Sequence, residues 1–186
     1  MPRISDAKIL IIATDGFEQS ELEFPRDQLR VKGATVHVAT PDGASIKGWE
    51  GSDWGRDAEA DLKIADVQVE DYDALVLPGG QINPDVLRVD LDAVTLIKRF
   101  AQAGRVIAAI CHAPWLLIEA GIVRDREMTS YGSIKTDLKN AGADWKDVAV
   151  ACDNGIVTSR SPEDLEAFVG KIVEEIEEGS HARQVA

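Results

Sequence analysis

Two adjacent residues, Cys111 and His112, carry the strongest chemical potential in this chain, within the segment "RVIAAICHAPWLLIE". A thiol beside an imidazole is a common pairing for nucleophilic catalysis, in which sulfur attacks an electrophilic carbon and histidine moves the proton. Cys111 ends an apolar run typical of a buried strand, and Pro114 suits the first turn of a helix. We therefore expect a sharp strand-to-helix turn that presents an exposed thiolate, favoured by the positive end of the helix dipole.

The alternatives for this pair stay open at the level of sequence. Cys111 also fits a small buried hydrophobic residue with no chemical role. His112 either approaches the sulfur, donates its backbone N–H to an oxyanion, or faces solvent or an interface.

Two further strand ends carry residues that suit a site. Gly79 and Gly80 directly follow the apolar "ALVL" in "LPGGQINPD". Paired glycines allow backbone N–H groups to approach a ligand closely, as an oxyanion hole requires, although they also serve in tight turns.

Acidic residues follow the first predicted strand, in "ATDGFEQSELEFP". Glu18 and Glu21 are three positions apart and share a face if a helix has begun there. A carboxyl group buried near a thiolate has a raised pKa, stays protonated and donates a hydrogen bond to sulfur. The alternative is a solvated helix start, where acidic residues favour the dipole in any case.

The remaining candidates indicate no metal and no cofactor. Cys152 fits a structural thiol, His37 a packed or edge residue, and His181 a tail position. None of the three histidines has the spacing of a zinc site, and neither a G-x-G-x-x-G nor a Walker loop is present. Trp49 and Trp54 are candidates for an interface.

Composition narrows the classes of partner. The 186 residues carry a net charge of −13, which argues against nucleic acid and anionic membranes as main partners. The first apolar run, "ILIIA", is too short for a signal peptide core, and two cysteines do not make a disulfide scaffold. We expect a cytoplasmic location and no membrane association.

The order of elements predicts the fold class. Short apolar runs alternate with amphipathic segments, which is typical of a doubly wound, mostly parallel α/β sheet covered by helices on both faces. Strands are expected at 8–14, 35–40, 74–77, 105–110, 148–152 and 156–159, and helices at 19–32, 90–103, 114–120 and 162–178. Residues 43–70, with "GWEGSDWG" and the alternating "DLKIADVQVE", predict a small β-hairpin excursion, and Asn154-Gly155 predicts a tight hairpin. One domain over 1–186 is expected, with a frayed tail from about 179 to 186.

Five segments together resemble the PfpI family of the class I glutamine amidotransferase-like superfamily. They are "GFEQSELEFP", "DALVLPGGQINPD", "AAICHAPWLL", "TSYGSIKTDLKNAGADW" and "IVTSRSPEDLEAF", in that order between about Lys8 and Val173. The resemblance implies a flavodoxin-like sandwich that forms a homodimer or a larger homo-oligomer.

The resemblance also implies roles for individual residues. Cys111 is the nucleophile, Glu21 hydrogen-bonds its thiol, and Glu18 lies near a subunit interface. His112 matches the histidine beside the nucleophile, and Tyr131 matches a tyrosine that lines the pocket. Asp85 matches an acidic position that reaches histidine from a second subunit in some members, here as Asp rather than Glu.

Three functions are consistent with these residues. The leading interpretation is a general stress protein that acts on reactive carbonyls, as a glyoxalase III or as a deglycase of glycated protein, through the Cys111 thiolate. The first alternative is an intracellular cysteine peptidase. The second is a redox sensor or holdase chaperone that uses an oxidisable Cys111 without catalysis.

Overall fold

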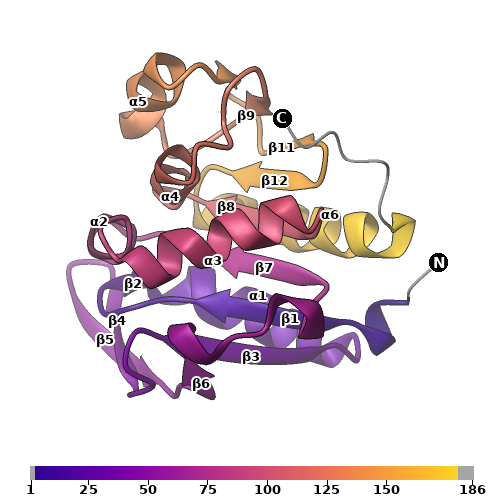
Figure 1. The fold of residues 1–186 in the computed structure, drawn as a ribbon. Helices are drawn as coiled ribbons and strands as arrows, with labels where there is room; N and C mark the ends of the chain where they lie inside the picture. Colours follow the sequence, from indigo (N-terminus) through magenta and orange to yellow (C-terminus); the bar gives the residue numbers. More distant parts are fainter. Residues whose placement is uncertain (1–2, 180–186) are drawn as a thin grey trace.

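A seven-stranded sheet forms the centre of the computed structural model, which describes residues 3–179 (Figure 1). The order of its strands is β11-β12-β8-β7-β1-β3-β6. All neighbours pair in parallel except β11 and β12, which are antiparallel. The strands are β1 (Lys8–Ile12), β3 (Thr35–Thr40), β6 (Leu62–Lys63), β7 (Ala74–Leu77), β8 (Val106–Ile110), β11 (Val150–Asp153) and β12 (Ile156–Ser159).

Helices cover both faces of this sheet. Figure 1 shows α3 (Leu91–Gln102) crossing one face, while α1 (Gln19–Val31) and α6 (Leu165–Glu178) lie behind the other. A hydrophobic core lies on each face of the sheet, and alternate residues of β1 pack into one or the other. Leu10 and Ile12 pack on the α3 side, and Ile9 and Ile11 pack on the α1–α6 side. The predicted mostly parallel α/β sandwich is therefore confirmed.

Short sequence signals correctly predicted where several helices and strands begin or end. The carboxyl group of Asp90 accepts a hydrogen bond from the Ala93 amide (3.0 Å) and caps α3. Asn154 and Gly155 have φ values of 50° and 78°, as the predicted two-residue hairpin between β11 and β12 requires.

The β-hairpin predicted within residues 43–70 is present, but the rest of this segment differs from the prediction. A hairpin of β4 (Ile46–Glu50) and β5 (Asp53–Ala58) is present, and β2 (Phe17–Glu18) extends it into a three-stranded sheet. The alternating segment 61–70 is mostly not a strand: beyond β6 it forms the 3₁₀ turns η2 (Ile64–Asp66) and η3 (Val69–Asp71). Turns bring its buried side chains onto one face, toward the α3 core; these are Ile64, Val67 and Val69.

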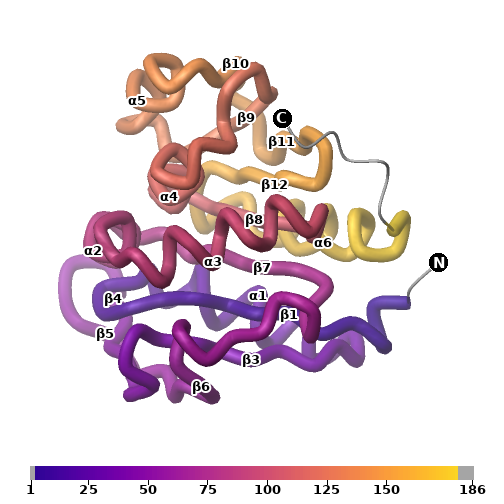
Figure 2. Tube along the Cα trace, viewed as in Figure 1, coloured from indigo at the N-terminus to yellow at the C-terminus, as the bar shows by residue number. Residues whose placement is uncertain are grey.

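Several short elements were not predicted. They are α2 (Ile82–Leu87), α5 (Lys135–Asn140), β9 (Glu127–Met128) and β10 (Asp144–Trp145). Figure 2 shows α5, β9 and β10 gathered at one end of the molecule, beyond α4 (Pro114–Glu119).

The predicted frayed tail lies, apart from Gly179, outside the described residues, so a single domain over 1–186 stays a prediction. Within residues 3–179, none of the helices combines the length and apolar character needed to cross a bilayer.

The sheet brings three strand ends to one place. Because β1, β7 and β8 are adjacent and parallel, the loops that follow them leave the same edge of the sheet. These loops lead to Glu18 and Glu21, to Gly79 and Gly80, and to Cys111 and His112.

Candidate active site

Cys111 occupies a strained turn at the end of β8. Its φ of 65° lies in the left-handed region, where a residue with a side chain is held only if its surroundings compensate. Two backbone hydrogen bonds hold it: its N–H donates to Ser159 O (3.0 Å), and its carbonyl accepts from the Tyr131 amide (2.9 Å). The predicted sharp turn between strand and helix is therefore confirmed.

Glu21 lies fully buried in the first turn of α1. Its Oε2 accepts a hydrogen bond from the Gly79 amide (2.8 Å), and its carboxyl group interacts with the Cys111 thiol. Burial, with a smaller contribution from the nearby Glu18 charge, raises the pKa of Glu21 to about 8. At neutral pH this carboxyl group therefore carries a proton, as expected from the sequence, and its buried Oε1, which has no hydrogen-bond partner within residues 3–179, is free to donate one.

Gly79, in the loop after β7, lies against Glu21 of α1 and against Cys111 at the end of β8. A Cβ at this position would lie 2.5 Å from Oε2 of Glu21 and 2.6 Å from Cβ of Cys111. Its amide is occupied by Glu21, so the sequence-based assignment of Gly79 as an oxyanion donor does not fit this geometry. Gly79 instead leaves room for the acid to reach the thiol.

The backbone amides of Gly80 and His112 point at the sulfur atom. Both lower the pKa of Cys111 through hydrogen bonds, so they stabilise negative charge there. Gly80 has a φ of 77°, and a Cβ on it would lie 2.6 Å from the Glu18 amide nitrogen. Asn83, which the sequence analysis did not single out, fixes this loop by donating to Pro78 O (2.9 Å) and accepting from the Thr14 amide (2.8 Å).

His112 points at the thiol. Its Nδ1 lies 3.1 Å from Sγ of Cys111, and its Nε2 lies 3.1 Å from Oγ of Ser133. The ring stacks on Tyr131 (centroids 4.8 Å apart) and meets Trp115 edge-on at 5.2 Å. Burial lowers the pKa of His112, so its imidazole is neutral at neutral pH. Sequence alone left this orientation open, and nothing in the sequence marked Ser133 or Trp115.

The prediction of an exposed thiolate with a low pKa is contradicted. Cys111 is only 6% exposed, and burial raises the pKa of its thiol. The helix behind it, α4, has only 6 residues, so its dipole is a weak source of compensation. The resting site thus holds a neutral thiol, a neutral carboxyl group and a neutral imidazole.

The other predicted residues lie farther out. Tyr131 is 44% exposed and forms the outer side of the His112 stack. Glu18 is half-buried in β2 and accepts a hydrogen bond from Ser20 Oγ (3.2 Å). Asp85 is exposed in α2 and makes no hydrogen bond or ion pair to His112 within residues 3–179.

Cys152, the second thiol, lies half-buried in β11 beside Glu175 of α6, and both cysteines are free. Among the described residues, no group of three or more histidine, cysteine or acidic side chains is placed to hold a metal ion.

Comparison with known proteins identifies the family of this chain. Residues 7–175 match the DJ-1/PfpI family, and the chain belongs to that family. It is 39% identical over 166 residues to Deglycase TK1284 of Thermococcus kodakarensis, covering 89% of this chain and 97% of that protein.

Two relatives in Bacillus subtilis bear other names. Putative cysteine protease YraA is 38% identical (87% of this chain, 93% of that protein), and General stress protein 18 is 39% identical (87% and 92%). Among solved structures, Drosophila melanogaster DJ-1beta superposes with a TM-score of 0.83 at 31% identity, covering 91% of this chain and 90% of that one.

The close approach at Gly79 makes a first prediction. Gly79→Ala is expected to lower the free energy of unfolding by about 1–3 kcal/mol, because the added methyl group collides with both Glu21 and Cys111. Urea unfolding followed by circular dichroism measures it. The matched control is Gly170→Ala in α6, where nothing lies within 4 Å and a gain of about 0.5–1 kcal/mol is expected. An unchanged stability for Gly79→Ala would contradict the packing described.

The raised pKa of Glu21 makes a second prediction. The folded chain holds this proton up to about pH 8, whereas the unfolded chain releases it near 4.5. Stability from this group is therefore complete below pH 4.5 and is lost as pH rises through about 8, by on the order of a few kcal/mol. Glu21→Gln, which keeps an N–H donor and an acceptor, is expected to flatten the decline between pH 5 and pH 8.

Urea midpoints measured across this pH range provide the readout. Glu166→Gln, at an exposed carboxylate in α6, should keep the wild-type slope. Glu21→Leu, which also removes the titrating group, should show the same flattened slope but lie about 1–3 kcal/mol below Glu21→Gln, because it leaves the Gly79 amide without an acceptor. A Glu21→Gln slope equal to that of wild type would refute the protonated carboxyl group.

Proposed function

We propose that this protein is a cysteine-dependent enzyme of the stress response that acts on reactive carbonyls, as free methylglyoxal or as glycated adducts of protein. The observation that carries the proposal is the 3.1 Å contact between Nδ1 of His112 and Sγ of Cys111, beside the protonated Glu21. This contact supports a nucleophile, a base and an acid acting within one small volume. The name of the Thermococcus relative, a deglycase, supports the same chemistry.

The first step forms a carbon–sulfur bond. Sγ of Cys111 attacks the aldehyde carbon of methylglyoxal as the thiol proton passes to Nδ1 of His112. The oxygen that becomes negative lies near the Gly80 and His112 amides, which already face the sulfur. Protonation of that oxygen by the imidazolium gives a neutral hemithioacetal and restores His112.

The second step rearranges this adduct and releases it. A proton leaves the former aldehyde carbon and one is delivered to the neighbouring carbonyl carbon through an enediol, which leaves a thioester of lactate on Cys111. Glu21, whose pKa of about 8 is close to neutral pH, and His112 are the groups able to carry these protons. Water then hydrolyses the thioester, so methylglyoxal plus water becomes lactate without any external oxidant.

Burial favours a small substrate over a peptide. The thiol is only 6% exposed, which admits a compact dicarbonyl or a slender adduct at the end of a side chain. Peptide hydrolysis is the second candidate, because a cysteine–histidine contact also serves acyl transfer and a relative is named as a putative cysteine protease. Neither activity requires a cofactor, and we place the protein in the cytoplasm.

We also propose that the working form is a homodimer or a larger homo-oligomer that associates through α2. Exposed apolar side chains lie on this helix, on the turn that follows it and at the first residue of α3: Ile82, Val86, Val89 and Leu91. Asp85 is exposed on the same helix and, within the described part of the chain, makes no hydrogen bond to His112. Association through this surface would bring Asp85 toward His112 of a second subunit. Contiguous exposed apolar side chains of this kind mark interaction surfaces.

Replacing the nucleophile separates the candidate activities. Cys111→Ser is expected to lower methylglyoxal loss, lactate formation and release of a methylglyoxal adduct from a glycated peptide by more than about 100-fold, since a serine hydroxyl is a far weaker nucleophile here. Cys152→Ser is the matched control and should stay within about twofold of wild type. Robust cleavage of an unmodified peptide by wild type, without any carbonyl turnover, would sink the proposal in favour of a peptidase.

Charged substitutions on the surface formed by α2 and the turn after it test the proposed self-association. The double variant Val86→Asp, Val89→Asp is expected to sediment as a monomer at concentrations where wild type is a dimer or larger, because like charges would face each other across the interface. Val31→Asp, at an exposed apolar side chain of α1, should leave the sedimentation coefficient unchanged. A monomeric wild type would rule this surface out as a self-association site.

A further inference from the structure

Ser133 is the least expected neighbour of the site. It lies in the 3₁₀ turn η4 (Gly132–Ile134), and its Oγ is 3.1 Å from Nε2 of His112. The opposite ring nitrogen, Nδ1, is 3.1 Å from the Cys111 thiol. Cys111, His112 and Ser133 therefore form a continuous hydrogen-bonded line within one chain.

We propose that Ser133 is a positioning residue that accepts a hydrogen bond from Nε2–H of His112 and so keeps Nδ1 free as the base for Cys111. The inference deepens the proposed function, because it assigns the group that orients the base. It also means that one subunit supplies the whole thiol–imidazole–orienter arrangement, with Nε2 already engaged before any second subunit approaches.

The hydrogen bonds around the ring favour one tautomer. A neutral imidazole carries a single proton, and a hydrogen bond at one nitrogen decides which of the two holds it. Two arrangements give each contact one donor and one acceptor: the thiol donates to Nδ1 and Nε2–H donates to Ser133, or Nδ1–H donates to the sulfur and the Ser133 hydroxyl donates to Nε2. The sulfur already accepts from the amides of Gly80 and His112, which favours the arrangement in which the thiol is the donor and the ring proton sits on Nε2.

Packing limits the ring to this orientation. Tyr131 covers one face of the His112 ring, and Trp115 meets it edge-on. Trp115 is itself fixed, because its Nε1 donates to Asp137 Oδ2 (2.8 Å). Rotating the imidazole by half a turn would place carbon atoms opposite both Sγ and Oγ, and both hydrogen bonds would be lost.

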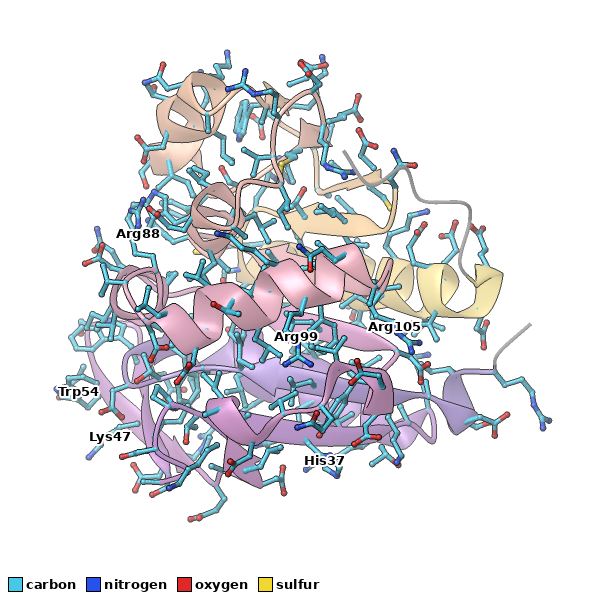
Figure 3. All side chains as sticks on the ribbon, viewed as in Figure 1. His37, Lys47, Trp54, Arg88, Arg99 and Arg105 are labelled. Atoms are coloured by element: carbon cyan, nitrogen blue, oxygen red, sulfur yellow. The ribbon has the colours of Figure 1, made fainter. Side chains whose placement is uncertain are left out.

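The charged surroundings of the ring are few. Within residues 3–179, the titratable groups that contact it are Cys111, directly after β8, and the Tyr131 phenol, and Glu21 interacts with the thiol. Arg88, labelled in Figure 3, follows α2. It stacks on Trp115 at 5.2 Å and pairs with Glu119 of α4, and Asp137 accepts a hydrogen bond from Trp115. A neutral hydroxyl as orienter stabilises the imidazolium far less than a carboxylate does, so it leaves His112 a weak base that is charged only during turnover.

Three variants at position 133 test the proposal. Ser133→Ala is expected to lower both the second-order rate of Cys111 alkylation by iodoacetamide at pH 7 and kcat/KM for methylglyoxal by about 5- to 30-fold, the range for one lost hydrogen bond. Ser133→Thr, which keeps a hydroxyl, should recover most of the loss. Ser133→Asp should move the acidic limb of the alkylation-rate profile to higher pH, because a carboxylate raises the pKa of the imidazole.

Nitrogen-15 spectra of His112 provide the decisive signature. In wild type, Nε2 should give the resonance of a protonated nitrogen and Nδ1 that of an unprotonated one, and Ser133→Ala should shift the two toward an average of both tautomers. Ser5→Ala, at an exposed serine in another 3₁₀ turn (Ile4–Asp6), is the matched control and should change nothing.

These measurements separate the two proposals. Alkylation and nitrogen-15 spectra need no carbonyl substrate, so they report on Ser133 even if methylglyoxal is not turned over. A wild-type His112 protonated on Nδ1, or a Ser133→Ala variant with an unchanged alkylation profile, would overturn the role of Ser133. Ser133 is exposed, so folding is not at risk; equal melting temperatures for wild type and variant confirm it.

Discussion

The close approach of three chain segments at Gly79 is the constraint on which the site depends. The loop after β7, the first turn of α1 and the end of β8 meet where a single Cβ would touch Glu21, Cys111 and the Ile110 carbonyl, all within 2.7 Å. The amide of Gly79 then holds the carboxyl group, and the amide of Gly80 faces the sulfur. Any added side chain at this point would push the carboxyl group of Glu21 and the thiol of Cys111 apart.

Burial at this point also sets the charge of the site. Each of its three ionisable groups is pushed toward its uncharged form, since burial raises the pKa of Glu21 and Cys111 and lowers that of His112. Such a site costs little to keep dry, because no isolated ion is buried. Charge appears only when a substrate arrives, and the amides of Gly80 and His112 are already in place to receive it.

The sequence allowed the fold and the sharp turn at Cys111 to be predicted, because both rest on local patterns. Apolar runs, glycine caps and Asn154-Gly155 are short-range signals, and Cys111 before Pro114 marks a strand-to-helix turn. The short elements α2 and α5, each of 6 residues, have too few turns to show a helical period.

The features of the site that could not be predicted arise from contacts between residues far apart in the sequence. Ser133 is 21 residues from His112, and its hydroxyl is no different in type from those of other exposed serines. Gly79 was correctly predicted to lie in the site, but its predicted role as an oxyanion donor does not fit. Only the fold shows that its amide donates to the carboxyl group of Glu21, 58 residues earlier in the sequence. The pKa of Cys111 was misjudged because burial, which a short motif does not reveal, outweighs the dipole of a short helix.

The parallel pairing of β1, β7 and β8 has a consequence for how the protein reaches its working state. Glu21, Gly79, Cys111 and Ser133 come from four segments that no hairpin joins, so their meeting requires crossover connections that each close a long loop. Pairings of this kind form slowly during folding. Helices and individual strands can therefore be present in a refolding chain well before its thiol has an acid beside it, and reactivity of Cys111 reports completion of the sheet rather than its beginning.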